Sequence, residues 1–595
     1  MCGINMILDF SGNVQIEHIQ KMMNAIEHRG PDANNSMANP FGKGTVFLGS
    51  NRLTIIDRNE DSNQPFVSQD GKYALLFNGE IYNFEELRNQ LISKGVQFKT
   101  LSDTEVLLHW LMHKGESGVS DLNGMFAFVF IDFDQTKIIA SRDSMGIKPL
   151  FVTQSAKQLI FSSEINGILA SGLVAKELNK DVIPHYLAYK YAPRPATFYK
   201  GIEEVLPNSL WQIDSLGKVE NSSTPVQRTD EVVDVNQLLI DSVVQQYSAP
   251  NNTGVMLSGG VDSTLLLAIL NKELGFRNIP VFSIASKGKN KFATKDGSFA
   301  IKAAKLYKAE YSEIGIDESS IGLLGEYVQT LGQPIADSGG FLTWLIAQEA
   351  IGKSNVLLSG AGADELFAGY NRHNAFYKYL KYRDKNWFSL LKHGKRLFSI
   401  LPKSRQIKKL ANAINNDPST TFNNFIQSDD FRKEERLWDN NLSNEAHLRN
   451  ALAHDQENYL SADVLTITDL ATMQHSIEAR VPYLDNKIVQ ATRNLSAETL
   501  LKNGPKWMLK EQLTKYEGKS FANRKKEGLG LPMDDWFRNN RQWFDFNSEE
   551  NIVHQFVDQE TIQTLLSKHC FGKENLTQEL WRILLLHQWL KHNFT

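Results

Sequence analysis

Cysteine is almost absent from this chain of 595 residues, which has only Cys2 and Cys570. Two cysteines cannot build a disulfide framework or a zinc cluster, so a reducing compartment fits. No apolar run approaches the roughly 18 residues that cross a bilayer, and no basic leader precedes the short apolar run near Met1. We therefore expect a cytoplasmic protein with no membrane partner.

An excess of basic charge is also missing. The chain has 64 Lys and Arg against 68 Asp and Glu, a formal net charge of −4, so no nucleic-acid partner is expected. The signatures G-x-S-x-G, H-E-x-x-H and G-x-x-x-x-G-K-[ST] do not occur. Their absence argues against a serine hydrolase, a zinc protease and an ordinary Lys-bearing phosphate loop.

The pattern of apolar residues changes once along the chain. Up to about residue 200, short runs rich in Val, Ile and Phe alternate with turn residues and predict a largely β unit. A polar segment at 214–231 follows, and beyond it strands alternate with helices, which is typical of a doubly wound parallel sheet. We expect two units, at 2–213 and 230–595, with a helical C-terminal part in the second.

The stretch SGGVDS at 258–263 lies between an apolar run and a leucine-rich run. Its glycines allow a sharp turn, and the helix that follows would direct free N–H groups at an anion. Asp262 would repel a phosphate unless a divalent cation lay between them, and Mg²⁺ is the usual mediator. The acid therefore predicts a metal ion.

A second stretch, VLLSGAGADELFAGY at 356–370, repeats this chemistry and carries Asp364. In an open α/β sheet ligands bind beyond the carboxyl ends of the strands, so two such loops can face one nucleotide. The alternative is that both are glycine turns in which Asp262 and Asp364 only cap helices. The occurrence of two such loops favours the nucleotide site.

SGGVDS resembles the pyrophosphate-binding loop of the ATP pyrophosphatases, a group that adenylates substrates and includes several ligase families. The amino terminus narrows the choice. Once Met1 is removed, the α-amino group of Cys2 can act as a base for its thiol, the arrangement of N-terminal nucleophile hydrolases. A lone cysteine near a terminus is usually structural, so the motifs around it decide.

Those motifs occur in one order along most of the chain. They are CGI at 2–4, HRGPD at 28–32, NRLTIID at 51–57, LLFNGEIYNFEELR at 75–88, SDTEVLL at 102–108, GMFAFVFID at 124–132, RDSMGIKPLF at 142–151, HSIEARVPYLD at 475–485 and PKWMLKEQL at 505–513. With both loops, they resemble the asparagine synthetase B family. The resemblance implies an N-terminal nucleophile αββα sandwich, a class II glutamine amidotransferase domain, before an ATP pyrophosphatase-type α/β domain.

For the first domain, the resemblance implies Cys2 as the nucleophile on the amide of glutamine, with Asn78 and Gly79 as the oxyanion hole. It also implies that Arg52 binds the carboxylate of glutamine and that Asp103 and Glu80 hold its ammonium group. The full set of glutamine-binding residues is Arg52, Leu53, Ile55, Asn78, Glu80 and Asp103.

For the second domain, the resemblance implies an ATP site whose Mg²⁺ is bound by Asp262 and Asp364 and whose phosphates meet Lys506. The ATP-binding residues are Leu257, Ser258, Gly259, Gly260, Asp262, Ser263, Ile284, Ser359, Gly360 and Lys506. For Glu478, an acid–base role near the acceptor and an ion-pair or capping role both remain open.

The reaction implied is amidation of aspartate to asparagine through an aspartyl-AMP intermediate, with glutamine, aspartate and ATP as substrates. The resemblance also implies a homodimer. One departure concerns the acceptor: family members often carry glutamate where this chain has Ala361. An alternative is therefore a relative that amidates another carboxylate, on a sugar, a peptide or a secondary metabolite. A catalytically idle descendant is disfavoured, because Cys2, Asn78, Asp262 and Asp364 are all present.

Overall fold

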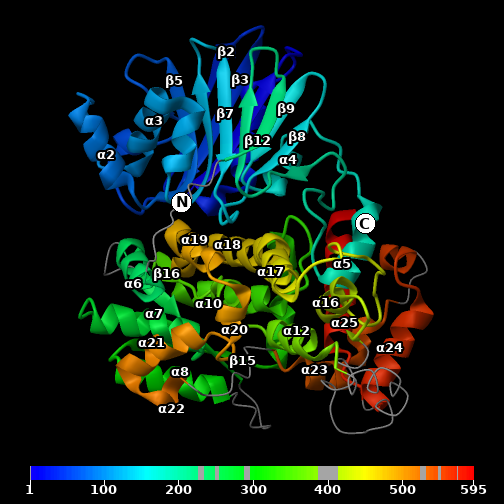
Figure 1. Ribbon diagram of the computed structural model, residues 1–595. Coiled ribbons are helices and arrows are strands. Elements are labelled where there is room, and N and C mark those ends of the chain that lie inside the picture. Colours follow the sequence, from blue (N-terminus) through cyan, green and yellow to red (C-terminus); the bar gives the residue numbers. More distant parts are fainter. Residues whose placement is uncertain are drawn as a thin grey trace.

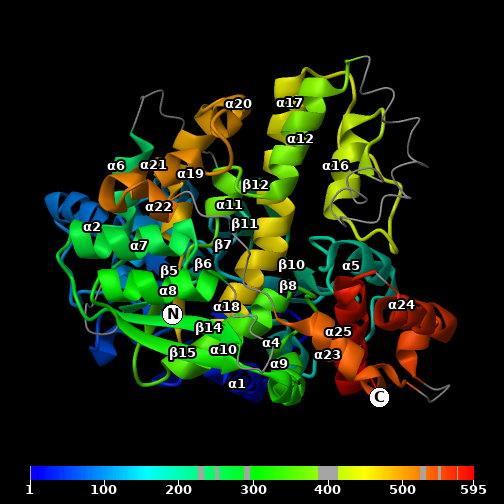
Figure 2. The same cartoon turned by 90° about the horizontal axis from the view of Figure 1, so that it is seen from below.

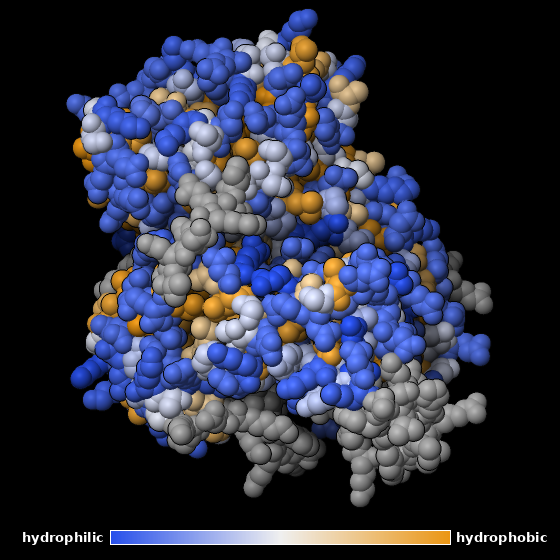
Figure 3. Space-filling model, in the orientation of Figure 1, coloured by the Kyte–Doolittle hydropathy of each residue, from blue (hydrophilic) through white to orange (hydrophobic). Residues whose placement is uncertain are grey.

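The computed structural model describes residues 2–224, 234–247, 253–286, 295–385, 413–522, 531–546, 551–572 and 574–594. The chain forms two stacked units, with the N-terminal unit above the C-terminal one in Figure 1. The surface seen in Figure 3 is mostly hydrophilic. Across the described ranges, no helix combines the length and the apolar character needed to span a membrane.

The N-terminal unit contains two antiparallel six-stranded sheets. In spatial order, the first sheet consists of β10 (Glu203–Glu204), β8 (Phe151–Gln154), β9 (Gln158–Ser162), β1 (Cys2–Asp9), β3 (Gly44–Arg52) and β2 (Ala33–Phe41). The second consists of β12 (Val219–Ser223), β11 (Ser209–Ile213), β7 (Lys137–Arg142), β6 (Gly124–Asp132), β5 (Tyr73–Ile81) and β4 (Phe66–Val67).

Successive side chains of a strand point to opposite faces of its sheet, which explains the layers of helices and sheets in this unit. On β1, Ile4, Met6 and Leu8 belong to the core between the two sheets, whereas Ile7 packs on the other face, in a cluster with residues of α1 (Ile16–Ala25) and α4 (Ile165–Ala170). The second sheet has the same pattern and buries Phe77 in a cluster with α2 (Phe84–Ser93) and α3 (Asp103–Lys114). The predicted αββα sandwich is confirmed.

The N-terminal sheet extends past the predicted end of the first unit at residue 213. Strand β12 pairs with β11 in an antiparallel hairpin that reaches Ser223. Residues 225–233, which include the end of the predicted polar boundary segment, lie outside the described residues. The division at 213 and 230 stays a prediction.

The C-terminal unit is built on a five-stranded parallel sheet, as predicted. Its spatial order is β15 (Glu310–Ile316), β14 (Pro280–Ser286), β13 (Thr253–Met256), β16 (Val356–Leu358) and β17 (Glu478–Arg480). The strand order reverses between β13 and β16, which is where open α/β sheets bind ligands. Both predicted loops leave the sheet at this point, because 258–263 follows β13 and 359–364 follows β16.

Helices cover both faces of this sheet. Val281 and Leu358 share a buried cluster with α7 (Val261–Lys272), while Phe282 and Leu357 share another with α10 (Ser338–Ala350). Most described segments beyond residue 370 are helical, as expected, and Figure 2 shows them from below. Among them are α12 (Asn371–Tyr382), α16 (Pro418–Ile426), α17 (Asn444–His454), a π-helical segment (Asp455–Leu465), α18 (Thr466–Met473), α19 (Asn486–Asn494), α21 (Trp507–Glu517), α24 (Gln559–Phe571) and α25 (Thr577–Phe594).

Buried polar contacts join the two units. Arg29, from the HRGPD motif, is fully buried and pairs with Glu164 of its own unit at 2.9 Å and with Asp469 of the other at 2.9 Å. The Asn123 side chain donates to Asp485 Oδ2 at 2.8 Å. Removing one member of a buried pair leaves an uncompensated charge, so these contacts fix the relative position of the units.

Candidate active sites

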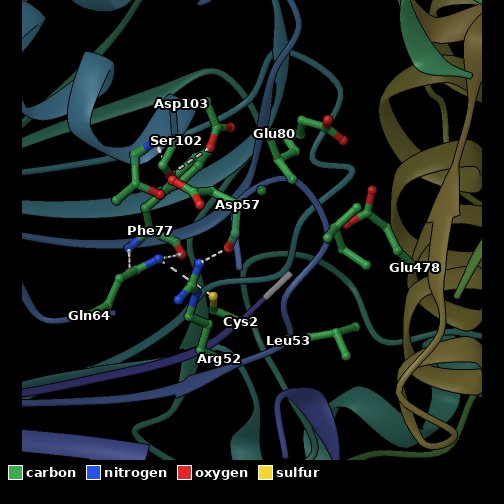
Figure 4. Close-up of a pocket in the computed structure, with 14 residues that line it drawn as sticks. Cys2, Arg52, Leu53, Asp57, Gln64, Phe77, Glu80, Ser102, Asp103 and Glu478 are labelled. Atoms are coloured by element: carbon green, nitrogen blue, oxygen red, sulfur yellow. Dashed lines mark hydrogen bonds between the residues drawn. The ribbon is translucent and has the colours of Figure 1, made fainter. Parts of the chain in front are cut away.

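The first candidate site, here called the Cys2 pocket, opens in the N-terminal unit where it faces the C-terminal unit (Figure 4). Its lining residues come from the start of β1, the end of β3 and the segment that follows it, strand β5, the start of α3 and strand β17. They are Cys2, Arg52, Leu53, Ile55, Ile56, Asp57, Gln64, Phe77, Gly79, Glu80, Ser102, Asp103, Thr104 and Glu478. All predicted glutamine-site residues are in this set except Asn78, which contacts Cys2 directly.

Cys2 begins strand β1 and pairs in register with Arg52 at the end of β3. The thiol is almost fully buried, and Sγ lies 3.5 Å from the donor Nε2 of Gln64. Burial raises the pKa of the Cys2 thiol, although the nearby Arg52 guanidinium acts in the opposite direction. A nucleophile with a raised pKa needs a base, which removal of Met1 would supply as an α-amino group.

Asn78 provides a donor of the kind an oxyanion hole requires. It lies on β5 and is fully buried, and its Oδ1 accepts from the backbone N–H of Cys2 at 3.2 Å. Its Nδ2 is buried and has no hydrogen-bond partner in the described part of the chain. Next to it, a Cβ added at Gly79 would lie 2.1 Å from the carbonyl oxygen of Met125, so the close approach of β6 requires glycine there.

Backbone oxygens and an amide hold the Arg52 guanidinium at the pocket wall. Nη1 donates to Asn59 O at 3.0 Å and to Asn63 Oδ1 at 2.7 Å, and Nη2 donates to Asp57 O. A planar guanidinium fixed in this way is suited to a ligand carboxylate.

Asp103 and Glu80 place two carboxyl groups in the same pocket. Asp103, the first residue of α3, accepts from the N–H of Ile81 at 3.1 Å, and burial raises its pKa to about 6. Burial also raises the pKa of Glu80, and the neighbouring Glu478 and Asp103 add to the effect. Asp103 is therefore ionised at neutral pH, as a partner for an ammonium group must be.

Strand β17 brings side chains of the C-terminal unit to this pocket. Figure 4 shows Glu478 facing Glu80 across the pocket. The fully buried Arg480 guanidinium pairs with both carboxylates, through Nε at 2.5 Å from Glu478 and through Nη2 to Glu80. Although burial opposes it, Arg480 lowers the pKa of Glu478 to about 2. Glu478 thus forms an ion pair and lines the Cys2 pocket; it is not among the residues that line the second site.

The second candidate site, here called the Asp262 cavity, lies beyond the carboxyl ends of β13, β14 and β16 and has a volume of about 310 Å³. Its lining residues are Met256, Leu257, Ser258, Asp262, Ser263, Phe282, Ser283, Ile284, Asp337, Gly339, Leu342, Thr343, Ile346, Ser359, Gly360, Ala361, Asp364, Tyr459, Val464, Ile467 and Thr468. Among the predicted ATP and metal residues, Gly259, Gly260 and Lys506 are outside this lining.

Local hydrogen bonds shape the loop after β13. The Ser263 hydroxyl, in the first turn of α7, accepts from the N–H of Ser258 at 3.1 Å, and the Ser258 hydroxyl accepts from Gly260 N–H at 3.2 Å. Gly259 has a φ of 71°, which favours glycine. These contacts turn the chain into the N-terminus of α7, an anion site in other proteins of this architecture.

Lys506 joins the two loops. Its ammonium group lies 2.6 Å from Asp262 Oδ2 and 2.5 Å from Asp364 Oδ1, and its side chain is almost fully buried. Lys506 has a φ of 54°, in the left-handed region where a non-glycine residue is strained. At Gly369, an added Cβ would lie 2.0 Å from Lys506 Cε, so glycine leaves room for the lysine.

The donor set fits a divalent cation that is shared with phosphates. Asp262 Oδ1 is buried and has no hydrogen-bond partner in the described ranges. No group of three or more His, Cys, Asp or Glu side chains is arranged to hold a metal among the described residues. Mg²⁺ is commonly held by one or two carboxylates together with substrate phosphates, which is what Asp262 and Asp364 can provide.

Several residues of these sites were not predicted. Gln64 and Asp57 line the Cys2 pocket, and Asp337 and Tyr459 line the Asp262 cavity. Asp57 ends the motif NRLTIID, which contains Arg52, and Gln64 follows a few residues later. Their closeness to Arg52 in the sequence could have indicated that they line the same pocket. Asp337 caps α10 and Tyr459 lies in a π-helical segment, and neither carries a sequence pattern that indicates a cavity.

A buried cysteine in an αββα sandwich, next to a glycine-turn cavity on a doubly wound sheet, defines a glutamine amidotransferase joined to an ATP-dependent ligase. The comparisons agree. A glutamine amidotransferase domain model matches residues 1–223, and an asparagine synthase model matches residues 234–591. The chain belongs to the asparagine synthase family and is a glutamine-dependent ligase whose family uses ATP as a substrate.

Similar curated proteins extend over nearly the whole chain. Asparagine synthetase [glutamine-hydrolyzing] 1 of Bacillus subtilis (strain 168) is 29% identical, over 97% of this chain and 93% of that protein. Asparagine synthetase [glutamine-hydrolyzing] 3 of the same organism is 26% identical, over 95% and 93%. Amidase chyE of Penicillium rubens is 25% identical, over 90% and 89%.

Proposed function

We propose that this protein amidates aspartate to asparagine, using ammonia from glutamine and driving the reaction with ATP through an aspartyl-AMP intermediate. The observation that carries the proposal is the position of β17. Its side chains Glu478 and Arg480 reach the Cys2 pocket, while the backbone oxygen of Arg480 accepts from Ser359 N–H, at the rim of the Asp262 cavity, at 2.8 Å. One three-residue strand therefore touches both sites.

In the Cys2 pocket, the thiolate attacks the side-chain amide of glutamine. Asn78 Nδ2, which has no partner in the described protein, and the backbone of Gly79 would stabilise the oxyanion of the tetrahedral intermediate. Collapse of the intermediate releases ammonia and leaves a thioester, which water hydrolyses to glutamate. Arg52 would hold the carboxylate of glutamine, and ionised Asp103 with Glu80 would hold its ammonium group.

In the Asp262 cavity, an acceptor carboxylate oxygen attacks the α-phosphorus of ATP, and pyrophosphate leaves. Leu257, Ile284, Ser359 and Gly360 are proposed to contact adenosine, and Ser258, Gly259, Gly260 and Ser263 to cradle the phosphates. Mg²⁺ bound by Asp262 and Asp364 would supply charge neutralisation for the phosphates. Lys506 already bridges these carboxylates and would turn part of its charge to the leaving group.

Ammonia then attacks the acyl carbon of the adenylate, forming the amide and releasing AMP. Ammonia is protonated in water at neutral pH and is then no longer a nucleophile, so transfer within the protein would preserve it. Strand β17 contacts both sites, and this closeness of the two pockets supports such a transfer between them.

A second acceptor class is favoured by one observation. Ala361 lines the Asp262 cavity at the position where family members often carry glutamate, so the cavity lacks a carboxylate there. One similar protein is named an amidase and not an asparagine synthetase. The alternative is an enzyme of the same mechanism that amidates another carboxylate, on a sugar, a peptide or a secondary metabolite. We also propose the units 2–213 and 230–595, a homodimer and a cytoplasmic location.

The test is a product analysis. The protein is incubated with glutamine labelled with ¹⁵N in its side-chain amide, with aspartate and Mg·ATP, and the products are identified by mass spectrometry. The proposal predicts labelled asparagine in equal amounts with AMP and pyrophosphate. Glutamate formation without asparagine, accompanied by a labelled amide of another supplied acid, would favour the second acceptor class.

A further inference from the structure

Part of the Asp262 cavity is not used by the proposed nucleotide contacts. This part, here called the α10 wall, consists of Asp337 at the N-cap of α10, Gly339 and Thr343 of α10, Tyr459 and Val464 of the π-helical segment, and Ile467 and Thr468 of α18. Because ATP is proposed to contact the loops after β13 and β16, the α10 wall offers a surface for the acceptor.

Asp337 is the only ionisable residue of the α10 wall apart from the tyrosine, and its geometry is fixed. It is the N-cap of α10, and Oδ1 accepts from Gly339 N–H at 2.8 Å. Oδ2 accepts from the Lys190 ammonium at 3.1 Å and from the Tyr459 hydroxyl at 3.2 Å. A carboxylate has about four acceptor positions, so three bonds leave room for a further donor.

The contacts of Asp337 keep it charged. Although burial opposes it, the adjacent Lys190 lowers the pKa of Asp337, which is therefore ionised at neutral pH. The side chain remains partly exposed, at 20%, and Asp337 lines the cavity. A rigid, ionised carboxylate at a cavity wall is a receptor for a cationic or strongly donating group.

The charge of the whole cavity supports a cationic ligand group. Among the residues that the structure describes, its ionisable lining residues are Asp262, Asp337 and Asp364 with Tyr459, and no described Lys, Arg or His joins them. Lys506 and a divalent cation would neutralise the charges of Asp262 and Asp364, which lie at the phosphate end of the cavity. Asp337 lies apart from them, at the N-cap of α10, and its charge remains available to the acceptor.

We propose that Asp337 binds the ammonium group of the acceptor, which is therefore an amine-bearing carboxylic acid such as an amino acid with a second carboxylate. The carboxylate to be activated extends from this anchor to the phosphates, and Lys190 and Tyr459 act as positioning residues for Asp337. This inference rests on the proposed function and narrows its acceptor. It disfavours acceptors without an amine, such as uronic acids, within the second acceptor class.

The test uses Asp337→Asn, which preserves the cap, because asparagine is as good an N-cap as aspartate, while removing the charge. Carboxylate-dependent exchange of labelled pyrophosphate into ATP is measured with aspartate, with succinate, which lacks only the amine, and with N-acetylaspartate. Loss of a charge-assisted hydrogen bond should raise the KM for aspartate by about 10- to 100-fold. The KM for ATP and the glutaminase activity should stay unchanged, which a general structural defect would not allow.

Wild-type protein should discriminate strongly between aspartate and succinate, and Asp337→Asn should lose most of that discrimination. Asp558→Asn, which changes the N-cap of α24 outside the cavity lining, is the matched control and should behave as wild type. Unchanged KM and discrimination in Asp337→Asn would overturn the inference, as would wild-type protein that activates an amine-free carboxylate as well as any amino acid. If a different amino acid is activated in place of aspartate, the proposed function fails on its acceptor while the Asp337 anchor is supported.

Discussion

Arg480 pairs with Glu80 across the boundary between the two units, and both side chains are buried. Glu80 directly follows Gly79, whose backbone is the proposed oxyanion-hole donor. Arg480 is bonded through its backbone oxygen to Ser359, beside the proposed nucleotide site. The ion pair therefore links the position of the loop after β16 to the position of the Cys2 pocket.

Replacing Arg480 with methionine should uncouple the two reactions. The change leaves Glu80 and Glu478 buried without their shared cation, at a cost of about 3–5 kcal/mol for the broken network. We expect the KM for glutamine to rise and more than one glutamate to form for each amide product. Assays of both products, with glutamine or with ammonia as donor, measure this.

The control for Arg480→Met is Arg449→Met, which removes a half-exposed arginine paired with Glu445 and should leave the glutamate-to-amide ratio unchanged. A parallel loss of the glutamine- and ammonia-dependent reactions in Arg480→Met would show that Arg480 acts only through overall stability.

The raised pKa of Asp103 predicts the acid limit of glutamine use. Burial raises this pKa to about 6, so protonation removes the negative charge of Asp103 as the pH falls through that value. Because the charge is proposed to bind the ammonium group of glutamine, kcat/KM for glutamine should fall below about pH 6. A pH series of glutaminase activity measures the effect.

Asp103→Asn is the matched variant for this series. It should lower kcat/KM at neutral pH and abolish the inflection near pH 6, while ammonia-dependent synthesis keeps its wild-type pH profile. Persistence of the same inflection in Asp103→Asn would assign it to another group.

Asp262→Asn should separate the nucleotide reaction from the glutaminase. The change removes the negative charge and turns one oxygen into an amide nitrogen at a carboxylate whose Oδ1 has no hydrogen-bond partner in the described protein and which fits a divalent cation. Pyrophosphate exchange should fall by about 100-fold, the usual scale for losing a preorganised charge in a site. Basal glutaminase activity should survive. Magnesium titrations of wild type and variant test the cause, since equal nucleotide binding with and without magnesium would exclude the proposed metal role.

The sequence predicted the proximity of site residues best where a motif lies at the end of a strand. Cys2, Arg52 and Asp103 are separated by up to about a hundred residues, yet they lie in one pocket because β1 and β3 pair and α3 begins beside β5. The loops with Asp262 and Asp364 meet because β13 and β16 are neighbours at the reversal of strand order. In both cases the fold class was enough to predict the proximity.

The sequence was least informative for contacts between units. Strand β17 is three residues long, too short for a periodic pattern, so the position of Glu478 in the Cys2 pocket could not be inferred. Lys190 and Asp337 are likewise brought together only by packing of α5 (Ile183–Tyr189) against the C-terminal unit. Neither Lys190 nor Asp337 belongs to a motif, and their contact depends on how the units pack together.

We propose that ammonia made at Cys2 is consumed in the Asp262 cavity of the same chain. The Cys2→Ala variant separates the two reactions, with amide synthesis measured from glutamine and, separately, from ammonium at a pH where free ammonia is present. Glutamine-dependent synthesis should be abolished while ammonia-dependent synthesis stays near the wild-type rate. Undiminished glutamine-dependent synthesis in Cys2→Ala would contradict this proposal.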